Sequence, residues 1–112
     1  MAFKVAVASS DNKFVNQHFG HARQFLVYEI ESDNFKYIET RTTDPLCGDQ
    51  EHDEDRLGRI AELLSDCQAV LVARIGPGAL GKLQSRGIKA YVLPQFIDDA
   101  LRTLISSARL GQ

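Results

Sequence analysis

The stretch AVLVA, residues 69–73, decides the fold of this 112-residue chain. It is short, apolar and uninterrupted, which is typical of a strand buried on both faces of a sheet. A helical pattern precedes it, and a Gly-Pro-Gly break at 76–78 follows it. A second helical pattern, another strand and a last helix complete the second half. Because this alternation is typical of parallel strands joined by crossover helices, the second half predicts an α/β fold.

The helical patterns around this strand have recognisable limits. Apolar residues in 57–64 recur at the i, i+3, i+4 spacing of an amphipathic helix. Residues 79–86 predict a short helix that Gly87 ends as a C-terminal cap. The last strand is expected at 88–93. The last helix is expected at 97–110, with an inward face formed by Ile97, Leu101, Leu104 and Ile105.

The first half predicts three further strands. Residues 3–8 are short and apolar, 24–31 alternates, and 35–43 is partly apolar. The short polar turn between the last two makes them an antiparallel hairpin, and one helical turn is expected at 21–24. Together the two halves predict a single α/β domain over 1–112. Its mixed five-stranded sheet begins with the hairpin and carries helices on its faces.

Composition narrows the classes of function. The formal net charge is −2 and no basic stripe is present, so nucleic acid is not an expected partner. The apolar runs are far shorter than the ~20 residues that span a bilayer, and no secretory signal is visible, so we expect a cytoplasmic protein. The two cysteines are too few for a disulfide framework. Cys67, between a helical pattern and a strand, is expected to be a small buried side chain.

Side chains with binding chemistry follow the predicted strands at three places. His18 and His21 lie in the loop after the first strand. Arg74 begins the loop after the AVLVA strand, and Cys47 lies in a turn-rich loop that leads into the first long helix. Ligands of open α/β sheets gather beyond the carboxyl ends of the parallel strands. If the first strand neighbours the AVLVA strand, the histidine and arginine loops lie side by side.

These groups favour an anionic iron–sulfur ligand. Thiolate and imidazole bind iron–sulfur species and zinc, whereas a guanidinium and exposed backbone N–H groups bind negative charge. Two histidines three residues apart with one distant cysteine do not match the closely spaced ligand pairs of a zinc site. They are also too few to build a whole cluster from free ions. The pattern therefore favours transient acceptance of a preformed cluster.

Each of these residues also has a structural interpretation. His18 is equally well explained as a hydrogen-bonded residue that pins its loop, and His21 as a polar residue at the start of a helical turn. The Gly-Pro-Gly break at 76–78 is more often a plain strand-to-helix turn than an anion site. These alternatives remain open at the level of sequence.

An ordered series of motifs carries a family resemblance over nearly the whole chain. The motifs are VNQHFGHA at 15–22, CG at 47–48, RIAELLSDC at 59–67 and VLVARIG at 70–76. With them the chain resembles the dinitrogenase iron–molybdenum cofactor biosynthesis family, that is, the NifX-like proteins and the C-terminal domain of NifB. The resemblance implies a ribonuclease H-like fold. By the same resemblance, His18 and His21 fall on the family's histidine-bearing loop and Cys47 on its loop cysteine.

The resemblance implies a carrier function. The expected cargo is an iron–sulfur precursor of the iron–molybdenum cofactor, or the finished cofactor, bound transiently and transferred between nitrogenase cofactor assembly proteins. His18, His21 and Cys47 are the expected metal contacts, and Arg74 is expected to balance cluster charge. No catalytic activity is expected, because the radical-SAM domain of NifB is absent from this sequence.

Two alternative functions belong to other classes of protein. One is a metal-free docking module for an assembly or nitrogenase component, in which the histidine loop is structural. The other is a metal-dependent hydrolase, which needs clustered carboxylates. Asp11 lies near the first strand, but no second strand-borne carboxylate accompanies it in the sequence.

Overall fold

The structure is a computed structural model that describes residues 2–31, 34–42 and 53–110. Its described elements are five strands, three α-helices and one short 3₁₀ turn. The strands are β1 (Ala2–Ala8), β2 (Gln24–Glu31), β3 (Asn34–Thr42), β4 (Ala69–Val72) and β5 (Lys89–Val92). The helical elements are η1 (Phe19–His21), α1 (Asp53–Leu63), α2 (Pro77–Gln84) and α3 (Ile97–Leu110).

The five strands form one mixed sheet in the order β3-β2-β1-β4-β5. Strand β2 is antiparallel to both β1 and β3, whereas β4 is parallel to β1 and β5. The central strand is β1, where Ala6 pairs with Val27 on one side and Val70 on the other. The predicted mixed sheet and its N-terminal hairpin are therefore confirmed. The ribonuclease H-like label that the resemblance implied stays a prediction.

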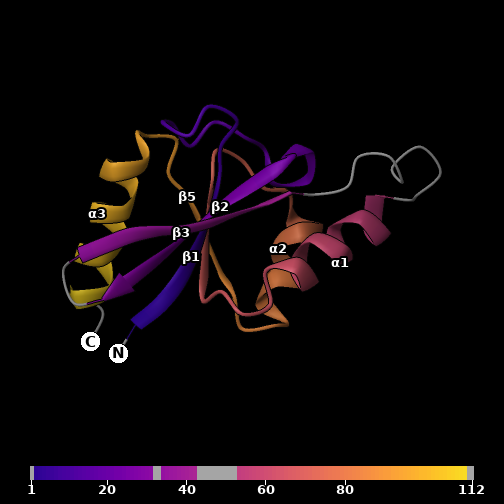
Figure 1. The fold of residues 1–112 in the computed structure, drawn as a ribbon. Helices are drawn as coiled ribbons and strands as arrows, with labels where there is room; N and C mark the ends of the chain where they lie inside the picture. The colour runs from indigo at the N-terminus through magenta and orange to yellow at the C-terminus, as the bar shows by residue number, and fades with distance from the viewer. Residues whose placement is uncertain (1, 32–33, 43–52, 111–112) are drawn as a thin grey trace.

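Helices cover both faces of the sheet, α3 one face and α1 with α2 the other (Figure 1). Strands β1 and β4 can lie between these layers because their side chains are apolar on both faces. Each layer has its own core. The core under α1 and α2 includes Phe19, Phe25, Ile60, Leu64, Leu83 and Ile88. The core under α3 includes Val15, Leu26, Leu71, Ile97, Leu101 and Leu104.

The loop after β1 is attached to the start of α3. Val15 N–H donates to the carbonyl of Gln95 at 2.8 Å, and Ile97 N–H donates to the carbonyl of Lys13 at 2.8 Å. Between these bonds, the rings of Phe14 and Phe96 meet edge to face with centroids 5.2 Å apart. The loop is therefore held by main-chain bonds at its middle as well as by β1 at its start.

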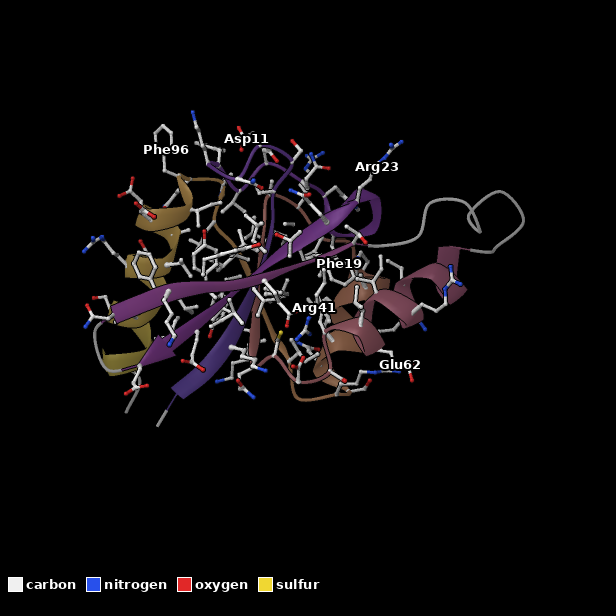
Figure 2. The ribbon with its side chains drawn as sticks, in the orientation of Figure 1. Asp11, Phe19, Arg23, Arg41, Glu62 and Phe96 are labelled. Carbon is white, nitrogen blue, oxygen red and sulfur yellow. The ribbon has the colours of Figure 1, made fainter. Side chains whose placement is uncertain are left out.

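Arg41 ties the outer strand β3 to the turn between α1 and β4 (Figure 2). Its guanidinium donates to both carboxylate oxygens of Asp66, at 2.6 and 2.8 Å, and to the carbonyl of Leu63 at 3.0 Å. The Nζ of Lys4 on β1 lies 3.1 Å from the same carboxylate. Bidentate pairs of this kind are the stronger class of surface ion pair. They lower the pKa of Asp66, with the Arg41 hydrogen bond as the largest cause.

Two helical elements differ in position from the prediction, whereas the strand ends lie within one residue of it. The helical turn expected at 21–24 is wrong, because η1 spans Phe19–His21 and Gln24 already belongs to β2. Helix α2 begins at Pro77 and not at residue 79. A proline suits the first helical position, where its fixed φ is favourable and its missing N–H is not needed.

Gly87 ends α2 as predicted. Its φ is +75°, a conformation that side-chain-bearing residues rarely adopt. The N–H of Gly87 donates to the carbonyl of Gln84 at 3.0 Å, and the N–H of Ile88 donates to that of Leu83 at 2.9 Å. These bonds satisfy carbonyls that the helix end leaves open.

No helix among the residues that the structure describes has the length and apolarity needed to cross a membrane.

Candidate functional site

The histidine segment continues the sheet beyond the carboxyl ends of β1 and β4. The N–H of Ala73 donates to the carbonyl of Gln17 at 3.0 Å, and the N–H of Phe19 donates to that of Arg74 at 2.9 Å. His18 and Arg74 are paired as an isolated parallel bridge. The expectation that the histidine and arginine loops lie side by side is confirmed. The structure therefore brings together His18 and Arg74, two residues that are 56 positions apart in the chain.

His18 caps the turn η1. Its backbone is extended, with φ −72° and ψ 137°, and its Nδ1 accepts a hydrogen bond from the N–H of Gly20 at 3.1 Å. The side chain is half-buried at the rim of the sheet. His18 therefore makes the hydrogen bond within its own loop that the structural interpretation predicts.

Phe19 anchors the same segment in the core. Its side chain is fully buried, and its ring centroid lies 5.8 Å from that of Phe25 on β2. In Figure 2 it lies between the sheet and the helices on that face. Phe19 is buried in the core, and the neighbouring His18 lies at the rim of the sheet. The burial of Phe19 therefore fixes the orientation of this segment.

Gly20 lies close to the surrounding side chains. A Cβ on Gly20 would lie 3.4 Å from Cδ2 of Leu57 and 3.6 Å from Cε1 and Nδ1 of His18. Leu57 belongs to α1 and packs against the core on that face. The imidazole of His18 and the side chain of Leu57 therefore both approach the Gly20 backbone.

A polar cavity of about 380 Å³ lies next to the histidine segment. Ligand pockets commonly have volumes of this order, roughly 300–1,000 Å³. The amide of Gln24 donates to the carbonyl of Ser9 and to Oδ1 of Asn12, both at 2.9 Å. The residues that line the cavity are Ser9, Ser10, Gln17, Arg23 and Gln24.

Asp11 serves the loop rather than the cavity. One of its oxygens accepts hydrogen bonds from the N–H groups of Lys13 and Phe14, at 2.9 and 3.0 Å, and from the hydroxyl of Ser9 at 3.1 Å. The bonds from Lys13 and Phe14, in that order, lower the pKa of the Asp11 carboxyl. The carboxylate that suggested a hydrolase is thus engaged in forming a turn.

The structure describes some of the remaining predicted residues and not others. The backbone of His21 ends η1, but its side chain lies outside the described part of the structure, as does all of Cys47. Cys67 is 3% exposed, so its predicted burial is confirmed. Burial, followed by the charge of Asp66, raises the pKa of the Cys67 thiol to about 11. Within residues 2–31, 34–42 and 53–110, no three His, Cys, Asp or Glu side chains form a group that could hold a metal ion.

Sequence reasoning missed the partner of the His18 ring. Helix caps are usually Ser, Thr, Asp or Asn, so a histidine before Phe-Gly carries no capping signal. It also missed the cavity, because Ser9 and Gln24 are brought together only by the pairing of β1 with β2. This part of the site is formed by residues that are distant in the sequence, and no local sequence pattern indicates it.

Comparisons with known proteins agree on one family. A family model described as "Dinitrogenase iron-molybdenum cofactor" matches residues 1–107. The chain is 42% identical over 100 residues to the FeMo cofactor biosynthesis protein NifB of Frankia alni, a match that covers 87% of this chain and 20% of that protein. It is 35% identical over 86 residues to protein NifX of Azotobacter vinelandii, covering 77% of this chain and 53% of NifX. The chain thus spans about a fifth of this NifB and about half of NifX.

Solved structures share the fold. The crystal structure of PH0822 superposes with a TM-score of 0.73 at 28% identity, covering 93% of this chain and 89% of that one. The apo form of the orange protein from Desulfovibrio gigas superposes with a TM-score of 0.66 at 17% identity, covering 93% of this chain and 88% of that one. The second likeness concerns the fold alone.

Proposed function

This chain belongs to the dinitrogenase iron–molybdenum cofactor family, and from that premise we propose that it is a carrier in cofactor biosynthesis. The cargo is an iron–sulfur precursor of the iron–molybdenum cofactor, or the cofactor itself. The chain binds this cargo transiently and transfers it between assembly proteins of the nitrogenase pathway. The relatives named NifB and NifX support this role, because both names belong to that pathway's proteins.

The cargo site is the rim formed by the histidine segment and the start of the loop after β4. His18 lies at this rim beside Arg74, which is exposed. We assign contact with the cargo to His18, His21, Cys47 and Arg74. Thr42 is the last residue of β3 and precedes the loop that holds Cys47. It pairs with Gln24, which lies three residues after His21. The chain therefore enters that loop close to the histidine segment.

The charges at this rim suit an anionic cluster. Arg74 and Arg23 are both exposed cations near the histidine segment, and Arg23 also lines the polar cavity. A guanidinium attracts a negatively charged cluster without forming a bond to iron. Few direct bonds combined with charge attraction allow the release that a carrier requires. The proposal assigns no catalytic step to the chain.

The direct test is anaerobic titration of the full chain with iron–molybdenum cofactor extracted from dinitrogenase. We expect the charge-transfer absorbance of the cofactor to elute with the protein during gel filtration. The variant with His18→Ala, His21→Ala and Cys47→Ala together is expected to lose this absorbance, because it lacks the three ligand side chains. Metal analysis of the protein peak measures the amount retained.

The control variant is Arg86→Ala, which changes an exposed cation in the turn after α2. It should retain cofactor like the wild type. Thermal unfolding of each variant establishes that the triple variant is folded. Equal retention by the wild type and a folded triple variant would refute the assignment of the site, and no retention by the wild type would refute the carrier function.

A metal-free docking module is the second candidate. The observation that favours it is the His18 hydrogen bond to Gly20, which gives this histidine a structural role without any metal. This candidate predicts that iron-free protein binds a cofactor assembly protein as tightly as the loaded protein does. Pull-down of purified NifB with and without cofactor measures the difference.

A further inference from the structure

The polar cavity beside the histidine segment is built from residues of three neighbouring segments. Ser9 and Ser10 follow the carboxyl end of β1, Gln17 belongs to the returning loop, and Arg23 and Gln24 stand at the start of β2. None of these five lining residues belongs to β4 or to the loop after it. The cavity is therefore formed by other residues than the proposed cargo site. It lies at the carboxyl end of a strand with a parallel neighbour, where α/β folds commonly bind ligands.

Hydrogen bonds hold the walls of this cavity in place. The amide nitrogen of Gln24 donates to the carbonyl of Ser9 at 2.9 Å, which ties the start of β2 to the residue after β1. Oδ1 of Asn16 accepts from the main-chain N–H of Ser10 at 3.0 Å and from the side-chain amide of Gln17 at 3.3 Å. Four of the lining residues are thus ordered by bonds to their neighbours. A ligand that enters has little order to impose on these walls, which favours binding.

The side chains that line the cavity are all polar, and Arg23 is the charged one. Its side chain extends into solvent at the edge of the molecule (Figure 2). Arg23 takes part in none of the ion pairs formed among residues 2–31, 34–42 and 53–110. The acidic residue of the adjoining loop, Asp11, does not line the cavity, and its carboxylate is bonded to the main chain of Lys13 and Phe14. The cavity is therefore a polar site with one positive charge.

These groups define the chemistry of a ligand. A guanidinium presents a fork of N–H groups that matches the two oxygens of a carboxylate. One cation balances one negative charge, so the cavity suits a monocarboxylate better than a doubly charged ion such as sulfate. The amide of Gln17 and the hydroxyl of Ser10 belong to groups that can both donate and accept hydrogen bonds. The rest of the ligand is therefore expected to carry hydroxyl groups and not an apolar chain.

We propose that this cavity binds a small carboxylic acid that carries hydroxyl groups. Its carboxylate pairs with Arg23, and its hydroxyl groups bond to Gln17 and Ser10. The cavity volume of about 380 Å³ corresponds to roughly a dozen water molecules at their liquid volume of about 30 Å³ each, which sets the upper size of the ligand. The inference goes beyond the carrier function and does not depend on it, because none of these contacts involves the cluster cargo.

The test is a titration of the ¹⁵N-labelled full chain with three compounds of similar size, followed by ¹H–¹⁵N correlation spectra at constant ionic strength. Glycerate has both the carboxylate and the hydroxyl groups, glycerol lacks the carboxylate, and butyrate lacks the hydroxyl groups. We expect glycerate to produce saturable shifts of the amide signals of Ser10, Gln17, Arg23 and Gln24. Glycerol should produce none, and butyrate should bind about tenfold more weakly because two neutral hydrogen bonds are lost.

Variants of Arg23 test the contact with the carboxylate. Arg23→Gln is expected to bind glycerate at least about tenfold more weakly, since charge-assisted hydrogen bonds are lost. Arg23→Lys keeps the charge without the fork and should bind with intermediate affinity. The matched control is Arg86→Gln, which removes an exposed cation from the turn after α2 and should bind like the wild type. Because both arginines are exposed, all three variants should fold, and thermal unfolding checks this.

Several results would overturn the proposal. They are the absence of saturable glycerate shifts in the wild type, and equal glycerate affinities of the wild type and a folded Arg23→Gln. Glycerol binding as tight as glycerate would exclude the role of the carboxylate, and butyrate binding as tight would exclude that of the hydroxyl groups. Sulfate provides the last arm, because binding tighter than that of glycerate would identify a site for inorganic anions instead. Each of these results leaves the carrier function untouched, since no cluster is present in the titration.

Discussion

At the scale of single residues, the contact between Arg41 and Asp66 makes stability depend on pH. The Arg41 guanidinium is the main cause that holds the pKa of Asp66 below its ordinary value of 3.8, and Lys4 acts in the same direction. A carboxyl with a lowered pKa stabilises the fold above its unfolded-state pKa, and this stabilisation is lost as the pH falls toward its folded-state pKa. The contribution of Asp66 is therefore full at neutral pH and declines below pH 3.8.

The variant Asp66→Asn tests this dependence. At pH 7 we expect its free energy of unfolding to be lower by about 1 kcal/mol, a figure kept small by solvent screening at a half-exposed carboxylate. The difference from the wild type should shrink as the pH is lowered from 4 to 2, because the Asp66 carboxyl of the unfolded wild type then binds a proton, whereas its lowered pKa keeps it charged in the folded state. Urea unfolding at a series of pH values measures it.

Glu62→Gln is the matched control, since Glu62 is an exposed carboxylate on α1 near the same turn (Figure 2). It should change the free energy of unfolding little at any of these pH values. A difference for Asp66→Asn that stays constant down to pH 2 would contradict the role of its charge.

Individual residues also show where sequence reasoning reaches its limit. The burial of Cys67 followed from its position between a helical pattern and an apolar strand, and the structure confirms it. The bond between His18 and Gly20 could not be predicted, because it depends on a three-residue turn held by the backbone of Arg74. Cys47 lies outside the described residues, so its place in the site stays a prediction.

At the scale of elements, the end of α2 depends on one left-handed residue. Gly87 has a φ of +75°, whereas Gly81 lies inside the helix, and a Cβ on either would have nothing within 4 Å. Gly87→Ala is expected to lower the free energy of unfolding by about 1 kcal/mol, because alanine is strained at that φ. Gly81→Ala is expected to raise it by about 0.5–1 kcal/mol, because alanine favours the helix.

Chemical denaturation of the two variants decides this prediction. Both changes add one methyl group in open space, so only the backbone conformation distinguishes them. Equal effects of the two substitutions would show that the left-handed cap contributes nothing to stability.

Elements with a repeating or uninterrupted apolar pattern were predicted well, whereas the three-residue turn η1 was not. The bounds of β2 and α3 follow from alternation and from an amphipathic face that runs from Ile97 to Leu110. The turn η1 was misplaced because three residues give no periodicity. Its position depends on the burial of Phe19 and on hydrogen bonds to a loop from the other half of the chain.

At the scale of the whole molecule, the sheet separates two cores that should contribute independently. Ile88 lies in the core under α1 and α2, and Ile97 lies in the core under α3. Each side chain is almost completely buried, at 1% and 2% exposed. Ile88→Val and Ile97→Val are each expected to cost about 0.5–1.5 kcal/mol, the usual effect of removing one buried methylene.

The double variant is expected to lose the sum of the two effects within about 0.5 kcal/mol, because the residues share no core. Denaturation curves of the wild type, both single variants and the double variant measure the coupling. A coupling above about 1 kcal/mol would mean that the two layers are packed as one unit through the sheet.

The overall arrangement was accessible from the sequence because α/β alternation leaves few topologies. Parallel pairing of β1 with β4 was expected only on the condition that these strands are neighbours, and the structure meets that condition. The same pairing brings His18 beside Arg74. The cavity beside them was beyond prediction, because Ser9, Arg23 and Gln24 come from loops and strand ends that only the pairing of β1 with β2 brings together.

The main-chain bonds of Gln17 to Ala73 and of Phe19 to Arg74 extend the parallel ladder past the last residue of β4. The rim around His18 is consequently preorganised, since its backbone is as constrained as that of a strand. A ligand captured there has little conformational entropy to remove, so a few weak bonds are enough for useful affinity. The same preorganisation means that this backbone does not have to rearrange when the ligand departs.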